Sequence, residues 1–268
     1  MGKHVRSWDE TKYRKYLKQE RGQGEGEAYT PWVSVQDFSS KGTISRVLGW
    51  KTNRVHHFMS NNELRYFYQL EWSDSILDIR EQFPLLDIEK TMSIAKEAGI
   101  KHPIDSQSGF PYVLTTDFLI TTADGLFART VKQSGELQNR RILEKLEIER
   151  RYWISKGVDW RIITEQEIAL QKTYNIEWLH NSKILSGLYL DSVLLSNVLL
   201  EIRRLYEGTN WPVLSFCERL DCRYDIPAGG SLRLFKHLAA NKFIDIGIDA
   251  KLNLSYQRSN IFAEALTV

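Results

Sequence analysis

Asp117 and Lys132 are the two residues whose types and spacing most clearly permit chemistry. They flank two runs rich in β-branched and aromatic residues, and Asp124-Gly125 separates these runs. An Asp-Gly pair between such runs predicts a tight β-hairpin. With Asp124-Gly125 as a two-residue turn, Asp117 lies directly opposite Lys132 on the neighbouring strand.

Thr130 completes this group, because the same register pairs it with Leu119 and side chains alternate between the two faces of a sheet. Asp117, Thr130 and Lys132 then share one face. A carboxylate beside an ammonium on a sheet face is the core of a metal-dependent phosphodiesterase site. It is equally an ordinary cross-strand ion pair, and these residues alone leave both interpretations open.

Glu63 is the candidate for a second carboxylate. Hydrolysis of a phosphodiester needs Mg²⁺ held by oxygen ligands, an activated water and positive charge near the phosphate. Glu63 lies in the first turn of a helix expected over 61–71 and could bind this metal. Ser60 and Glu63 also have the spacing of a capping box, in which Glu63 caps the helix instead. The two roles are not fully exclusive.

Glu149 is a further candidate, on a helix expected over 137–155. One stripe of this helix contains Ile142, Leu146, Glu149 and Trp153. A carboxylate on an otherwise apolar stripe is costly unless it has a partner. Glu149 could orient Lys132 or a water at the metal. It could equally pair with Arg150, Arg151 or another basic group at the edge of the helix.

The bulk composition sets limits on the class of protein. The 268 residues are 42% hydrophobic and 26% charged, which is enough for two domains with separate cores. No apolar run approaches the roughly 20 residues of a membrane helix, and the N-terminus has no signal-peptide pattern. Cys217 and Cys222 are too few for a disulfide framework or a zinc site. We expect both to be buried thiols of a cytoplasmic protein.

Basic residues concentrate at the start of the chain. Residues 1–60 hold 11 Lys and Arg against 6 Asp and Glu, although the formal net charge of the whole chain is only +2. Local basic clusters, rather than the overall balance, drive phosphate binding. This segment therefore permits contact with nucleic acid, but a solvated amphipathic helix over 8–20 explains its composition equally well.

Strands and helices alternate from about residue 43 to 164, which predicts a mixed α/β sheet. The expected helices are 61–71, 88–98 and 137–155. The expected strands, besides the hairpin, are 43–49, 54–59, 75–83 and 159–164, the last beside the hairpin.

The part of the chain beyond residue 165 is expected to be mainly helical. Helices fit 190–206, 211–220 and 231–241, and a short strand fits 243–248. Helix, turn, helix and strand is the order of a winged helix. Residues 169–268 hold 11 Lys and Arg against 10 Asp and Glu, whereas a DNA-reading helix is usually more basic. This composition suits a domain that binds protein.

Several uncommon strings of residues, in one order, resemble the TnsA family, the endonuclease subunits of heteromeric cut-and-paste transposases. The resemblance covers residues 20–180 and is faint beyond about 185. Its main strings are Arg21-Gly22-Gln23-Gly24, Leu77-Asp78-Ile79-Arg80-Glu81-Gln82-Phe83-Pro84, Gly99-Ile100-Lys101-His102-Pro103, Thr116-Asp117-Phe118-Leu119, Val131-Lys132 and Glu149-Arg150-Arg151-Tyr152-Trp153.

The resemblance implies a restriction-endonuclease-like α/β domain over 1–168, with a basic N-terminal helix, and a mostly helical winged-helix domain over 169–268. It implies cleavage of DNA at the 5′ ends of a mobile element with two Mg²⁺ ions, for which Mn²⁺ can substitute. Asp117 would bridge the metals, Glu63 would bind one, and Lys132 would position the attacking water.

Position 130 is where this chain departs from the family pattern, which has Gln where Thr130 stands. The family implies that the backbone carbonyl at this position adds a metal ligand, and a Thr then changes little. A requirement for the side chain would instead lower the metal affinity.

The resemblance also implies partners. These are DNA at the transposon ends, a TnsB-like transposase that cuts the 3′ ends, and a TnsC-like ATP-dependent regulator bound through the C-terminal domain. Lys51, Arg54 and Arg80 lie in or near the matching strings and are candidate DNA contacts. Two other functions remain open: a non-catalytic assembly factor in which the Asp117–Lys132 pair is structural, and a free-standing restriction-type nuclease.

Overall fold

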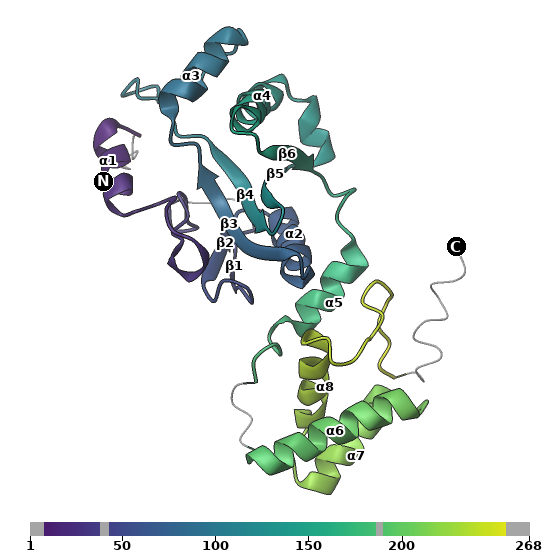
Figure 1. Cartoon of the computed structure of the whole chain (residues 1–268). Helices are drawn as coiled ribbons and strands as arrows, with labels where there is room; N and C mark the ends of the chain where they lie inside the picture. The colour runs from purple at the N-terminus through teal and green to yellow at the C-terminus, as the bar shows by residue number, and fades with distance from the viewer. Residues whose placement is uncertain (1–7, 38–42, 186–189, 256–268) are drawn as a thin grey trace, which may run out of the picture. The chain divides into compact units, whose positions relative to one another are not determined.

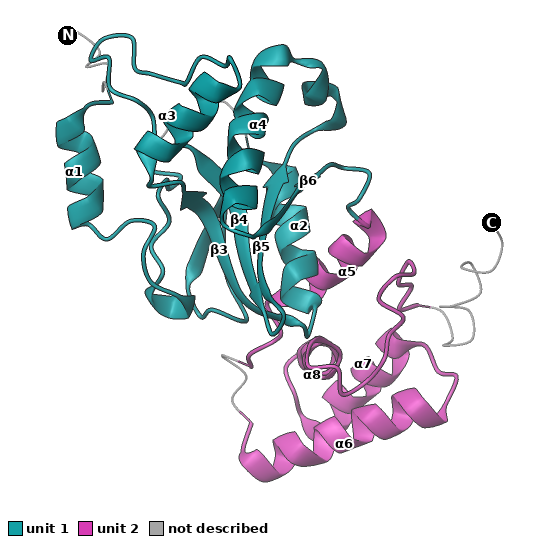
Figure 2. Cartoon of the chain, turned by 45° about the horizontal axis from the view of Figure 1, so that its top comes forward, with its two compact units in different colours: residues 1–168 teal, residues 169–268 magenta. Residues whose placement is uncertain are grey.

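A computed structural model describes residues 8–37, 43–185 and 190–255. The chain forms two compact units, residues 1–168 and 169–268 (Figure 2). The helices and strands of the first unit are α1 (Glu10–Lys18), β1 (Ser45–Leu48), β2 (Val55–Phe58), α2 (Asn61–Trp72), β3 (Ile76–Pro84), α3 (Ile88–Glu97), β4 (Thr115–Thr122), β5 (Gly125–Val131), α4 (Arg140–Ser155) and β6 (Asp159–Ile163). Two short 3₁₀ helices cover Gly26–Ala28 and Ser134–Gln138.

The first unit is built on a four-stranded sheet in the order β3-β4-β5-β6 (Figure 1). The neighbours are antiparallel except β5 and β6, which are parallel. The predicted mixed sheet is therefore confirmed, as is the position of β6 beside the hairpin. Strands β1 and β2 form a separate antiparallel pair.

Both faces of this sheet are buried. On one face Leu119 and Ala128 pack with Ile148 of α4. On the other, Phe118 packs against Phe58 of β2 and Tyr66 of α2. Full burial of a leucine, isoleucine or phenylalanine side chain contributes about 1.5–3 kcal/mol to folding, so Leu119, Ile148 and Phe118 help to hold β4 and β5 in place.

The hairpin turn differs from the expected one. The turn residues are Ala123 and Asp124, and Thr122 pairs with Gly125. A type I′ turn at Asp124-Gly125 needs positive φ at both residues, and of these two only Gly125 has it, at 127°. The hydroxyl of Thr122 instead accepts a hydrogen bond from the Asp124 backbone N–H at 3.1 Å, which stabilises the earlier turn.

The expected register is consequently wrong by two residues. Leu119 pairs with Ala128 rather than with Thr130, and Lys132 does not lie directly opposite Asp117. A slip of one residue moves a whole strand's side chains to the other face. A slip of two keeps them on the same face, so the hairpin core survives the error.

Strand β3 exchanges its two faces at Gln82. The Glu81 side chain bonds to His56 of β2, whereas Phe83, two residues later, packs against Trp153 of α4. Residues two apart in a regular strand share a face. Gln82 breaks this rule because its backbone is left-handed, with φ 48°.

Strand β4 makes the same exchange beside Gln82. Phe118 packs toward α2, whereas the Thr116 hydroxyl donates a hydrogen bond to Glu149 of α4. Asp117 lies between them, at the point where the two faces exchange. The crossing of the faces in β3 and β4 therefore determines where the Asp117 carboxylate projects.

The second unit contains α5 (Leu170–His180), α6 (Ser192–Gly208), α7 (Val213–Tyr224) and α8 (Gly230–Ala240). Tyr206, Phe216 and Phe235 pack together in its core. Asp221 of α7 accepts hydrogen bonds from the backbone N–H groups of Gly229 and Ser231, both at 2.7 Å. These bonds satisfy donors at the start of α8 and stabilise a helix–turn–helix.

The strand expected over 243–248 is wrong. Its alternation is real, since Ile244 and Ile246 are buried while Phe243 is exposed. Yet these residues bury their side chains from irregular backbone, and within 190–255 there is no strand for them to pair with. The helix–turn–helix of the expected winged helix is present, but the strand of its wing is absent from the described residues.

Cys217 is buried and Cys222 is exposed, so the prediction that both thiols are buried is wrong for Cys222, which lies on the outer side of α7. Among the helices in the described segments, none has the length and apolarity to cross a bilayer.

Candidate active site

Asp117 and Lys132 form the ion pair that the sequence suggested, by a different route. Lys132 follows the last residue of β5, and its Nζ atom donates to Asp117 Oδ2 at 2.9 Å. The Val131 backbone N–H donates to the same oxygen at 2.8 Å. Burial, the largest single effect, lowers the pKa of Lys132, but Asp117, Glu149 and Glu63 together raise it above its ordinary value. Lys132 is therefore a cation at neutral pH.

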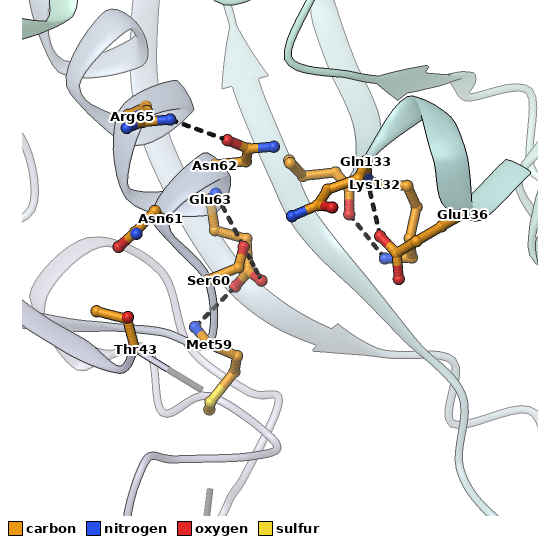
Figure 3. A pocket seen from close by; sticks show the side chains of 11 residues that line it. Thr43, Met59, Ser60, Asn61, Asn62, Glu63, Arg65, Lys132, Gln133 and Glu136 are labelled. Carbon is orange, nitrogen blue, oxygen red and sulfur yellow. Dashed lines mark hydrogen bonds between the residues drawn. The ribbon is translucent and has the colours of Figure 1, made fainter. Parts of the chain in front are cut away.

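Glu63 caps α2, as the capping-box spacing predicted. Ser60 accepts from the Glu63 backbone N–H at 3.2 Å, and its hydroxyl donates to Glu63 Oε1 at 2.8 Å. The Met59 backbone N–H donates to Oε2 at 3.0 Å (Figure 3). Burial, with the Asp117 carboxylate adding to it, raises the pKa of Glu63 to about 7. Capping and proximity to Asp117 therefore coexist in one side chain.

Gln82 links the two carboxylates. Its Nε2 atom lies 3.4 Å from Asp117 Oδ1 and 3.5 Å from Glu63 Oε2. Glu63, Asp117 and Lys132 are thus brought together from α2, β4 and the end of β5. Gln82 lies within one of the matching strings, but it was not among the site residues expected from the sequence. A left-handed glutamine inside a strand has no signature in residue type or periodicity.

Glu149 is buried and accepts three hydrogen bonds on Oε1. The donors are the hydroxyls of Thr116 (2.7 Å) and Thr130 and the indole N–H of Trp160 (3.0 Å). Burial is the main cause that raises the pKa of Glu149 to about 7. The partner that the apolar stripe required is thus a set of neutral donors.

The arginine alternative for Glu149 is wrong. Arg150 and Arg151 both form ion pairs with Glu147, at 2.7 and 2.6 Å. Those pairs lie on the more exposed side of α4, whereas Leu146, Glu149 and Trp153 are buried. Thr130 is itself buried, and its hydroxyl is directed to Glu149.

Lys132 lies between two cavities. The larger, of about 570 Å³, is lined by Thr43, Met59, Ser60, Asn61, Asn62, Glu63, Arg65, Val131, Lys132, Gln133 and Glu136 (Figure 3). The smaller, of about 320 Å³, is lined by Val113, Leu114, Thr115, Asp117, Thr130, Lys132, Glu136, Ile142, Lys145, Leu146 and Glu149. Glu63 faces the larger cavity and Asp117 the smaller. A substrate could therefore reach this group of side chains from two sides.

The donor atoms suit magnesium better than zinc. Within the described residues no group of three or more His, Cys, Asp or Glu side chains is placed to hold a metal. Zinc sites in proteins use three or four such ligands. Mg²⁺ uses one or two carboxylates and completes its coordination with water and substrate phosphate. Glu63 and Asp117 match the second pattern.

The chain is similar to known proteins along almost its whole length. Residues 73–165 match the family described as TnsA-like endonuclease N terminal, and residues 167–248 match the family described as TnsA endonuclease C terminal. Over 251 residues the chain is 41% identical to the transposon Tn7 transposition protein TnsA of Escherichia coli. The matched region covers 92% of this chain and 90% of that protein. The chain belongs to the TnsA family.

Membership of the TnsA family confirms the resemblance but assigns no role to any single residue. The N-terminal match contains Asp117, Lys132 and Glu149 and begins after Glu63. The role of Glu63 in this TnsA-family protein therefore depends on its geometry, which places it beside Gln82 and Asp117.

Two of the three residues selected as DNA contacts are buried in this TnsA-family protein. Arg54 is 8% exposed, forms an ion pair with Glu81, and donates to the Ile79 carbonyl at 2.8 Å. Arg80 is 7% exposed and donates to Thr121 Oγ1 at 2.9 Å. Both guanidinium groups are engaged in structural contacts in this conformation, which argues against the expected contacts with DNA. Lys51 is only partly buried and stays a candidate.

Proposed function

We propose that this protein is the Mg²⁺-dependent endonuclease subunit of a heteromeric transposase. It hydrolyses phosphodiesters at the 5′ ends of a mobile element, while a TnsB-like partner cuts the 3′ ends. The observation that carries this proposal is the convergence of Glu63 and Lys132 at Asp117, which Gln82 links to Glu63. Membership of the TnsA family supports it.

Glu63 and Asp117 would hold the metal. Asp117 Oδ2 already accepts from Lys132 and Val131, so Oδ1 is the oxygen available for a cation shared with Glu63. When bound, Mg²⁺ supplies Lewis-acid polarisation of the phosphodiester and lowers the pKa of water. Two carboxylates from two different elements keep this position fixed in the folded protein. From the family resemblance we assign a further ligand to the Thr130 backbone carbonyl; the Thr130 hydroxyl already donates to Glu149.

Lys132 acts through its charge in this proposal. A general base needs a pKa near the working pH, and the pKa of Lys132 is raised rather than lowered. Its ammonium instead offsets negative charge at the scissile phosphate and orients the attacking water as a hydrogen-bond donor. The Asp117 carboxylate holds the ammonium in place for this task.

Glu149 is a positioning residue. Its Oε1 atom accepts hydrogen bonds from the hydroxyls of Thr116 and Thr130. Thr116 directly precedes Asp117 in the chain, and Thr130 lies two residues before Lys132. It thereby ties β4 and β5 to α4 where the hairpin strands diverge. Loss of this tie would let the Asp117 backbone move relative to Lys132.

The second unit, residues 169–268, is proposed to bind protein partners. Its helix α8 carries only Arg233 and Lys236 as permanent cations, which is a low count for a helix that reads DNA. Helix α6 exposes the apolar side chains of Val193 and Leu200, each about two-thirds exposed. A TnsC-like regulator is the partner that we assign to this unit.

A reconstituted cutting assay tests the function. Asp117→Ala and Lys132→Ala are combined with a TnsB-like partner, Mg²⁺ and a labelled transposon end, and the 5′ and 3′ nicks are scored separately. We expect the 5′ nick to disappear while the 3′ nick and the circular-dichroism spectrum remain. Unchanged 5′ cutting by both variants would favour the assembly factor. Cutting of plain duplex without the partner would favour the free-standing nuclease.

A further inference from the structure

Gln82 has an unusual backbone for its position. Five residues other than glycine have positive φ within the described segments, and Gln82 is the one among them that lies inside a strand. An L-residue in the left-handed region costs about 1–2 kcal/mol. Strain of this kind is maintained where the surrounding structure imposes it, and it gathers at functional sites.

The left-handed conformation directs the Gln82 side chain to the two carboxylates. Gln82 is 7% exposed, and its Oε1 atom accepts from the Thr115 hydroxyl at 3.3 Å. This contact with Thr115 fixes which end of the amide is the oxygen. The other end, the NH₂ group, suits the ionised carboxylates, which can only accept hydrogen bonds. This NH₂ group then faces Glu63 and Asp117.

Two carboxylates that approach each other in a buried site repel one another. Among the described contacts, the Gln82 amide is the donor that reaches both Glu63 Oε2 and Asp117 Oδ1. Its N–H groups carry partial positive charge, so they serve between these oxygens as a weak substitute for a cation. Both contacts are long, at 3.4–3.5 Å, so a divalent ion can displace the amide at little cost.

We propose that Gln82 is a positioning residue of the metal site: its left-handed backbone places its amide between Glu63 and Asp117 and holds both carboxylates ready for a shared divalent cation. This inference rests on the proposed nuclease function. Gln82 is not assigned as a ligand, since its carbonyl oxygen is engaged with Thr115. Its contribution is to fix the two ligands before the metal arrives.

Titration of the full-length protein with Mn²⁺, followed by calorimetry and by the electron paramagnetic resonance of free Mn²⁺, tests this proposal without measuring cutting. Gln82→Met keeps the length of the side chain and removes the amide. We expect Mn²⁺ to bind Gln82→Met about tenfold more weakly, which corresponds to about 1.4 kcal/mol. Unchanged or tighter binding overturns the positioning role.

Two further variants separate the amide from the backbone. Gln82→Gly removes the side chain but relieves the left-handed strain. It should therefore bind Mn²⁺ as weakly as Gln82→Met but unfold at a higher temperature than Gln82→Met. Asn53→Met is the matched control, because Asn53 has φ 53° and bonds to Glu27 rather than to a site carboxylate. Its Mn²⁺ affinity should equal that of the wild type. A loss in Asn53→Met equal to that in Gln82→Met contradicts the proposal.

Thr115→Val keeps the inference testable if Gln82→Met does not fold. It removes the hydroxyl that orients the amide, and we expect weaker Mn²⁺ binding in the same direction. Wild-type binding that is absent, or that survives Asp117→Asn, contradicts the proposed function itself. Wild-type binding that is lost in Asp117→Asn but unchanged in Gln82→Met and Thr115→Val contradicts only the role of Gln82.

Discussion

Asp117 and Lys132 are joined by a 2.9 Å ion pair although the register of β4 and β5 does not place them opposite each other. The Lys132 side chain reaches Asp117 Oδ2 from just beyond the end of β5, while Oδ1 faces Gln82. The two oxygens of one carboxylate thus have different tasks: one fixes the cation of Lys132, and the other is turned toward Glu63.

The division between the two oxygens predicts that metal binding and cutting can be separated. Asp117→Asn should abolish both Mn²⁺ binding and 5′ cutting. Lys132→Met should lower cutting at least about a hundredfold, since several kcal/mol of charge stabilisation at the phosphate are lost, but leave Mn²⁺ binding near that of the wild type. Calorimetry and single-turnover cutting measure the two quantities. Lys132→Met that cuts normally would show that the pair is structural.

Stability of the metal-free protein should depend on pH through Glu63. The folded-state pKa of Glu63 is raised from 4.5 to about 7, so the folded protein binds more protons than the unfolded chain in this window. The free energy of unfolding should therefore fall as pH rises from about 4.5 to about 7, by roughly 2–3 kcal/mol for this group. Urea unfolding at a series of pH values measures it.

Glu149 shares this pH window, because its pKa is also raised from 4.5 to about 7. Glu63→Gln should therefore reduce the dependence of the unfolding free energy on pH by about half rather than remove it. Mg²⁺ should oppose the loss in the wild type above pH 7, since it binds the ionised form of Glu63. A stability that does not change between pH 4.5 and 7 would contradict the raised pKa values that burial gives these two carboxyls.

Glu149→Leu should destabilise the first unit. The change leaves the buried hydroxyls of Thr116 and Thr130 and the Trp160 indole N–H without their acceptor, and one buried unsatisfied donor costs about 1–3 kcal/mol. Glu149→Gln keeps an oxygen acceptor of similar shape and should be much milder. Urea midpoints distinguish the two variants. Equal midpoints would show that these hydrogen bonds contribute little to stability.

Arg54→Met should lower the stability of the folded protein and should not weaken DNA binding directly. It leaves Glu81 buried without its guanidinium partner, and breaking a buried pair in this way costs about 3–5 kcal/mol. Arg14→Met is the matched control, because Arg14 pairs with Glu10 on the exposed surface of α1, where such pairs contribute about 0–1 kcal/mol. Thermal unfolding measures both. A stable Arg54→Met protein with weakened DNA binding would restore Arg54 as a DNA contact.

Much of the first unit could be predicted from local patterns. Ser60 and Glu63 marked the start of α2, and the elements expected over 61–71 and 75–83 agree with α2 and β3 to within one residue at each end. The start of α4 is later than expected because Asn139 caps it and 134–138 forms a 3₁₀ helix. Helix caps and hydrophobic periodicity are properties of a few adjacent residues, so they can be recognised in the sequence without knowledge of tertiary contacts.

Local patterns in the chain are enough to predict that β4 and β5 form a hairpin, that Asp117 and Lys132 lie near its open end, and that Glu149 lies on a buried stripe. The register of that hairpin, the burial of Arg54 and Arg80, and the position of Gln82 between two carboxylates emerge only in the packed fold. Each of these depends on backbone angles or on partners distant in the chain. Periodicity reports which face a residue takes, whereas the packing of separate elements decides what that residue meets there.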